Sequence, residues 1–186
     1  MKWKKLSRKL IHETPWMKIF EDQTLNPAGE PTTYTFIEAQ SGAYVIAVQK
    51  NKNGEHEICL VQQSRYTNGT DAWELPGGGA EQAEDYKETG AREAYEEARL
   101  RVSDLVELSG KTYSMNGISS HSNHYFITRN IVVEPFVPDP TEGITDRQFF
   151  TIKQITQMMQ DERITDALTI AGLARAFAYL GHINTG

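Results

Sequence analysis

The pattern of apolar and polar positions divides the chain into short strand-like segments and a few helical ones. In the first forty residues, apolar and polar positions alternate between turn signals, which predicts a small antiparallel sheet. Two apolar runs joined by a polar turn follow, and two more lie after residue 120; all four are typical of buried strands. The predicted strands are 8–13, 16–24, 32–39, 43–48, 58–62, 125–128 and 131–133, with turns at 26–29 and 51–55.

Helix-forming sequence occurs in two regions. A Gly-rich stretch, 76–79, leads into a helical run over 81–100, and the tail 151–180 predicts two short helices. Three prolines fall within 134–146, and they predict a loop there because proline lacks the backbone N–H of regular structure. Together these elements predict an α+β fold in which helices pack on a mixed sheet.

Composition narrows the class of protein. The chain has 186 residues, 39% apolar and 24% charged, which predicts a single ordinary globular domain. Its net charge of −6 disfavours a nucleic-acid partner. No apolar run reaches the length of a membrane span, and the basic start 1–5 is not followed by the apolar stretch of a signal peptide. Cys59 is the only cysteine, so we expect no intramolecular disulfide and a cytoplasmic protein.

The most informative segment runs from Gly78 to Leu100. On a helix, Glu93 lies three residues before Glu96 and four before Glu97, so three carboxylates crowd one face and repel each other. A hard divalent cation removes that repulsion, and Mg²⁺ takes one or two carboxylates together with waters and substrate phosphates. The spacing therefore predicts a metal site for phosphate chemistry.

Neighbouring residues support this site. The glycines at 77–79 let the backbone approach a ligand closely, and the following helix offers its N-terminal N–H groups. Glu84 precedes Glu93 by nine residues, so we expect it near the helix start. Arg92 is always charged and is expected to orient the carboxylates through paired contacts. The alternative is a solvated acidic helix face, but the glycine spacing and the Arg92-Glu93 pair favour the metal site.

This segment resembles the signature of the Nudix hydrolases: a glycine, a glutamate and an Arg-Glu-apolar-x-Glu-Glu-x-Gly-apolar block. Six of the seven fixed positions match, and Arg99 stands where the family has glycine. That glycine commonly ends a helix in the left-handed conformation, which costs another residue about 1 kcal/mol. We therefore expect the helix to run on, or to end differently, near Ser103.

The resemblance implies an α/β/α sandwich with a mixed sheet and a loop-helix-loop, within one domain over 1–186. Residues 1–40 would form an N-terminal sheet and 41–186 the catalytic core. It also implies hydrolysis of a nucleoside diphosphate linked to another group, with Mg²⁺ or Mn²⁺ as the cofactor. The ions would be held by Glu93, Glu97, Glu96 and the Gly77 carbonyl, while Gly78 and Glu84 would lie at the substrate.

Flanking residues are similar to one branch of that family. The runs 62–66 and 73–78 look like the Q-x-R-Y and E-L-P-x-G runs of the ADP-ribose and ADP-sugar pyrophosphatases. This likeness implies a homodimer whose N-terminal sheet helps to bind the adenine. Trp16 would stack on the base, with packing in a dimer core as the alternative. Arg65 would contact the diphosphate or terminal ribose, or else form a structural salt bridge.

A further acidic residue is expected from a loop after the core strands. Glu142 is the best-placed candidate for a general base or extra metal ligand, with Asp139 and Asp146 in reserve; the alternative is an exposed loop residue. A water would lose its proton to Glu142 or a helix glutamate and attack phosphorus, which converts ADP-ribose to AMP and ribose 5-phosphate.

The substrate itself is left open by the sequence. His121 and His124 depart from the branch, and they either contact phosphate or sugar or simply border a strand. Another nucleotide sugar such as GDP-mannose, or a dinucleotide, is the rival substrate. A nucleotide-sensing module without turnover is the rival function.

Overall fold

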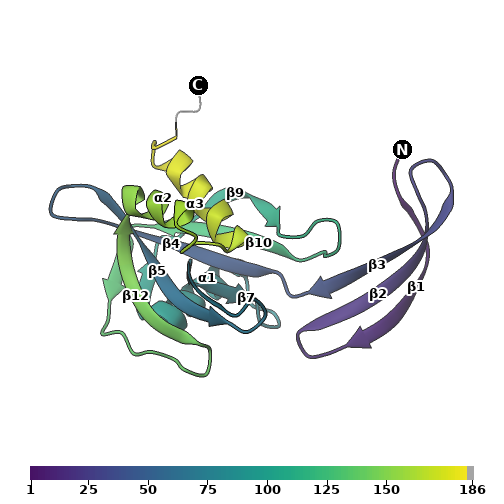
Figure 1. The fold of residues 1–186 in the computed structure, drawn as a ribbon, viewed down its shortest axis with the longest axis horizontal. Helices are drawn as coiled ribbons and strands as arrows, with labels where there is room; N and C mark the ends of the chain where they lie inside the picture. Colours follow the sequence, from purple (N-terminus) through teal and green to yellow (C-terminus); the bar gives the residue numbers. More distant parts are fainter. Residues whose placement is uncertain (184–186) are drawn as a thin grey trace. The chain divides into compact units, whose positions relative to one another are not determined.

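The computed structural model describes residues 1–183, except for the side chain of Ser109, and this range contains twelve strands and three helices. It divides into two compact units (Figure 1). The N-terminal unit consists of Met1–Ser41 and Tyr113–Ser122, and the core unit consists of Gly42–Thr112 with the residues from Asn123 onward.

The N-terminal unit is a three-stranded antiparallel sheet of β1 (Lys4–Glu13), β2 (Met17–Leu25) and β3 (Pro31–Ala39). The side chain of Asn26 accepts hydrogen bonds from the N–H groups of Ala28 and Glu30, which closes the expected turn between β2 and β3. Arg8 donates two hydrogen bonds of 2.8 Å to the Asp22 carboxylate. The three predicted N-terminal strands are confirmed.

The core unit is built on a mixed sheet with β12-β5-β4-β10-β9 in spatial order, β6 beside β5 and β7 beside β4. Strand β4 pairs in parallel with β10 and antiparallel with β5 and β7. Strands β8 and β11 form a separate antiparallel pair. The strands are β4 (Gly42–Lys50), β5 (His56–Arg65), β6 (Thr70–Glu74), β7 (Gly77–Gly79), β8 (Leu100–Ser103), β9 (Val106–Tyr113), β10 (Ser122–Thr128), β11 (Asn130–Val133) and β12 (Ile144–Thr151).

Helices cover both faces of this sheet (Figure 1). Helix α1 (Tyr86–Ala98) packs on one face through Ala94 and Ala98. Helices α2 (Ile152–Gln160) and α3 (Ala167–Tyr179) pack on the other face, where Ile155 and Leu173 join the core. The predicted α+β fold with helix layers on both sides is confirmed. No helix within residues 1–183 is long and apolar enough to cross a membrane.

Several predicted boundaries were wrong. Helix α1 begins at Tyr86 rather than near residue 81, because the Asp85 side chain accepts hydrogen bonds from the Lys87 and Glu88 N–H groups and caps the helix. The predicted loop over 134–146 is shorter, because β12 begins at Ile144. Strands β6, β7, β8, β9 and β12 were not predicted.

The C-terminus of α1 also corrects an expectation. The helix ends at Ala98, and Arg99 takes the left-handed conformation with φ 53° and ψ 39°. Its N–H donates to the carbonyls of Ala94 and Tyr95. The helix therefore does not run on toward Ser103: arginine adopts the conformation that glycine adopts more easily.

We expect Arg99→Gly to stabilise the protein by about 1 kcal/mol, because glycine has no Cβ to crowd the following carbonyl in the left-handed region. Urea denaturation measures this change in the free energy of unfolding. Arg129→Gly is the control, since Arg129 is exposed and, unlike Arg99, is not in the left-handed region. A loss of stability in Arg99→Gly equal to that of the control would contradict the strain.

Candidate active site

Two carboxylates, the buried Glu97 and the largely buried Glu93, lie between helix α1 and strand β7. The Glu97 side chain accepts a 2.8 Å hydrogen bond from the Gly77 N–H, and the residue is 6% exposed. The Glu93 side chain is 12% exposed and lies against Gly78, where an added Cβ would be 2.5 Å from Glu93 Oε1. Glycine at 78 is therefore required for this close approach of backbone to carboxylate.

Burial changes the proton affinity of both carboxylates. The pKa of Glu97 rises to about 8, mainly because of burial, and the nearby charge of Glu93 contributes to this rise. Burial is also the main cause of the raised pKa of Glu93. Two poorly solvated carboxylates at helix spacing form an oxygen donor set that a hard divalent cation would satisfy.

Arg92 holds the acidic residues around this pair. Its guanidinium donates to Glu84 Oε1 at 2.9 Å and Oε2 at 3.0 Å, and to the Gly79 carbonyl at 3.1 Å. It also donates at 2.8 Å to both Glu93 and Glu96. These contacts agree with the expected orienting role of Arg92. Glu84 lies just before the helix, as its spacing from Glu93 predicts.

Glu96 is arranged differently from its two neighbours. Its side chain is 50% exposed and is directed to Arg92. Within residues 1–183, no three His, Cys, Asp or Glu side chains form a ready-made cation cluster. Mg²⁺ takes only one or two protein carboxylates, so Glu93 and Glu97 could hold it without a third. Ligation by Glu93, Glu96 and Glu97 stays a prediction.

The ion pair of Glu84 predicts a pH dependence of stability. Its hydrogen bonds from Arg92 are the main reason that the pKa of Glu84 falls to about 2 from 4.5. A lowered folded-state pKa contributes stability above about pH 4.5, and this contribution is lost as the pH falls through 2. We expect Glu84→Gln to cost about 1–2 kcal/mol at pH 7 and progressively less toward pH 3, measured by urea denaturation.

Glu88→Gln is the control for this pH dependence. Glu88 accepts from the backbone N–H of Asp85, and glutamine serves equally well at this capping position. A cost for Glu84→Gln that stays constant from pH 7 to pH 3 would contradict the role of its charge.

The loop over 134–143 carries a third carboxylate, Glu142, whose charge acts on Glu93 and Glu97. Asp139 Oδ1 accepts hydrogen bonds from the N–H groups of Thr141 and Glu142, and the Glu142 carbonyl accepts from Gln63 Nε2 at 3.0 Å. The charge of Glu142 contributes to raising the pKa of both Glu93 and Glu97. The loop thus brings Glu142 within electrostatic reach of the buried carboxylates, while Asp139 shapes the turn.

Arg65 forms the salt bridge that its alternative interpretation expected. It donates to both oxygens of the buried Glu74, at 3.1 and 2.6 Å. Its charge also acts to lower the pKa of Glu97, so Arg65 lies close to the site. Contact between Arg65 and a substrate stays a prediction. The pairing of Glu74 with Arg65 was not predicted, because it depends on the register of β5 and β6.

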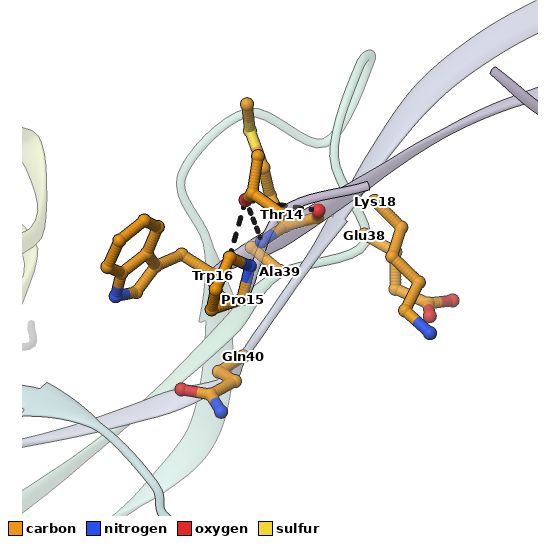
Figure 2. A pocket seen from close by; sticks show the side chains of 8 residues that line it. Thr14, Pro15, Trp16, Lys18, Glu38, Ala39 and Gln40 are labelled. Carbon is orange, nitrogen blue, oxygen red and sulfur yellow. Dashed lines mark hydrogen bonds between the residues drawn. The ribbon is translucent and has the colours of Figure 1, made fainter. Parts of the chain in front are cut away.

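Trp16 lies in the N-terminal unit, at the turn between β1 and β2. It is 76% exposed and lines a cavity of about 240 Å³ together with Lys18, Glu38 and Gln40. Figure 2 shows the indole on one side of the turn and the side chains of Lys18 and Glu38 on the other. An exposed indole is available for stacking, and its predicted role in base binding stays a prediction.

The two histidines have separate surroundings. His124 lies in β10, where its Nδ1 is 2.8 Å from Glu107 Oε1 and its ring stacks on Tyr86 with centroids 4.0 Å apart. His121 belongs to the N-terminal unit, where its backbone N–H donates to Ser119. His121 therefore agrees with a polar residue that borders a strand, whereas His124 lies within one.

Comparisons with known proteins bear on this arrangement. Residues 40–169 match the NUDIX domain family. The chain is 26% identical over 176 residues to CMP-5'-(N-acetyl-N-hydroxy-3-aminopropyl)phosphonate hydrolase of Streptomyces rubellomurinus. The matched region covers 93% of this chain and 81% of the relative. It is 30% identical over 109 residues to mouse (Mus musculus) diphosphoinositol polyphosphate phosphohydrolase 3-alpha, which covers 57% of this chain and 62% of that protein.

A solved structure shares the fold. The crystal structure described as that of an ADP compounds hydrolase superposes with a TM-score of 0.79, covering 98% of this chain and 96% of the other. The two sequences are 14% identical, so the likeness concerns the fold alone.

Proposed function

Because the chain belongs to the NUDIX domain family, we propose that it hydrolyses a nucleoside diphosphate linked to another group, with ADP-ribose or another ADP-sugar as substrate. The observation that carries this proposal is the poorly solvated pair of Glu93 and Glu97 held against the glycine backbone of β7. Such a pair is costly unless a cation offsets its charge, and diphosphates are bound in proteins together with divalent cations.

The residues of the core unit have distinct roles in this proposal. Glu93, Glu97 and the Gly77 carbonyl hold Mg²⁺ or Mn²⁺, and Arg92 fixes Glu93 and Glu84 in place. When bound, the cation supplies positive charge that offsets the charge developing on the diphosphate. Glu142 accepts the proton of the attacking water, and Gly78 leaves the space beside β7 that the Glu93 carboxylate occupies.

Two features support an adenine nucleotide. The runs around Arg65 and Glu74 are similar to those of ADP-sugar pyrophosphatases, and Trp16 exposes an indole on which a base could stack. We propose that the N-terminal unit contributes this indole within a homodimer in the cytoplasm. ADP-ribose would then yield AMP and ribose 5-phosphate.

A cytidine nucleotide is the second candidate. The relative from Streptomyces rubellomurinus is named for a CMP-linked phosphonate, and its likeness extends over 93% of this chain. The metal chemistry of the core unit would be the same, and the base pocket would differ.

Chromatography of reaction products tests the proposal. The purified protein is incubated with ADP-ribose, ADP-glucose, GDP-mannose, diadenosine polyphosphates and a CMP-linked phosphonate, with Mg²⁺ and again with chelator. We expect AMP from ADP-ribose only when Mg²⁺ is present. Turnover of the CMP-linked substrate alone would replace the adenine assignment, and saturable binding of ADP-ribose without hydrolysis would indicate a sensing module.

A further inference from the structure

Arg147 of β12 connects two segments of the core unit that carry acidic residues. It pairs opposite Val61 on the face of the sheet that α1 covers. Its Nη1 donates to the Ala98 carbonyl at 3.1 Å and to the Glu134 carbonyl at 3.2 Å. One guanidinium nitrogen therefore ties the end of the helix to the start of the loop over 134–143.

Both carbonyls occupy sensitive positions. Ala98 is the last residue of α1, follows Glu97 directly, and belongs to a last turn that has no basic residue of its own. Carbonyls at a helix C-terminus need donors from outside the helix, and a cation is favoured there. Glu134 begins the loop that carries Glu142, and its own N–H donates to the Arg99 carbonyl at 3.0 Å. Helix end and loop start are thus bonded to each other in two ways.

We propose that Arg147 is a positioning residue, which fixes the last turn of α1 relative to the loop over 134–143 and so sets the separation of Glu97 and Glu142. This inference rests on the proposed function, in which Glu97 holds the cation and Glu142 accepts the proton. Arg147 touches neither substrate nor reacting atoms in this scheme, and it acts through the two backbone segments.

The first variant is Arg147→Met, which keeps an unbranched apolar stem and removes the donors. We expect kcat to fall about 10–100-fold, as for partners that orient ligands, with KM changing by less than about threefold. Arg101→Met is the matched control. Arg101 is 62% exposed and donates to the Glu134 side chain at 2.5 Å. It contacts helix α1 through the Tyr95 side chain and not through the Ala98 carbonyl. Its kcat is expected to stay within about twofold of the original.

A double-mutant cycle separates positioning from general stability. In the Glu142→Gln background, we expect Arg147→Met to lower kcat no further, because the group that it positions has lost its function. A second decrease of the same size in that background would overturn the proposal, since it would show that Arg147 does not act through Glu142.

Hydrogen exchange of the metal-free protein tests the geometry without turnover. Arg147→Met is expected to speed exchange of the amides at 139–144, where Asp139 and Ile144 bond each other, and to leave β4 and β5 protected. Unchanged exchange in this loop would overturn the inference even in an active enzyme. Absence of turnover by the original protein on every substrate would instead overturn the proposed function. If Arg147→Met does not fold, Arg147→Gln serves the same comparisons, because its shorter, uncharged side chain does not place a nitrogen where Nη1 donates to both carbonyls.

Discussion

We expect Glu97→Gln to lower kcat by about 10²–10⁴-fold while the fold stays intact. The Glu97 carboxylate is buried beside Glu93. In this site its negative charge is what binds the cation, and glutamine lacks that charge. Glutamine has almost the same shape, and its amide oxygen can still accept the hydrogen bond from Gly77. Steady-state kinetics at saturating Mg²⁺ measure the loss, and circular dichroism checks the fold. Near-normal turnover would contradict the assignment of Glu97.

The same variant has an opposite effect on stability in the metal-free protein. Burial raises the pKa of Glu97 from 4.5 to about 8, so the folded state holds this proton more tightly than the unfolded state. The resulting stabilisation is fully present below pH 4.5 and is lost as the pH rises through 8. Glutamine does not ionise, so with chelator present Glu97→Gln should be more stable than the original protein at pH 9. Glu88→Gln, an exposed residue of the same helix, should show no such gain.

The fold was predictable wherever burial leaves a pattern in the sequence. Strands β4 and β5 are central, so both of their faces are buried and their sequences read as apolar runs. Strand β12 lies at the edge of the sheet and buries only Ile144 and Phe150, so its mixed sequence gave no comparable signal. The end of α1 was not predictable, because hydrogen bonds to Arg99 and packing of Ala98 outweigh the preference against a left-handed arginine.

In the site, too, contacts between residues close in sequence were predictable, and contacts between residues distant in sequence were not. Glu93 and Glu97 were recognised because positions four apart lie together on any helix. The Glu96 side chain points toward Arg92 because Arg92 donates a hydrogen bond to it. Sequence spacing alone does not show which of the nearby carboxylates Arg92 binds. The Arg65–Glu74 pair and the approach of Glu142 depend on strand register and on a loop, neither of which local spacing determines.

Gly78→Ala tests the contact between backbone and carboxylate most directly. The added Cβ would lie 2.5 Å from Glu93 Oε1 and 2.7 Å from its Cδ, too close for any atom pair of this kind. Because the obstacle is the end of a flexible side chain, we expect the Glu93 carboxylate to move and the strand to stay. Affinity for Mn²⁺ and kcat should each fall about 10–100-fold, measured by titration and by kinetics. The free energy of unfolding should change by less than about 1 kcal/mol.

Two other glycines make this result interpretable. At Gly77 an added Cβ would meet the Ala43 carbonyl oxygen at 2.5 Å and the Tyr44 Cα at 2.7 Å, so the obstacle is the backbone of β4. Gly77→Ala should therefore separate β7 from β4 and reduce stability as well as activity. Gly117→Ala meets no atom within 4 Å and should alter neither. If Gly78→Ala bound Mn²⁺ and turned over substrate like the original protein, Glu93 would not be a ligand, because a displaced carboxylate could not hold the cation in its original place.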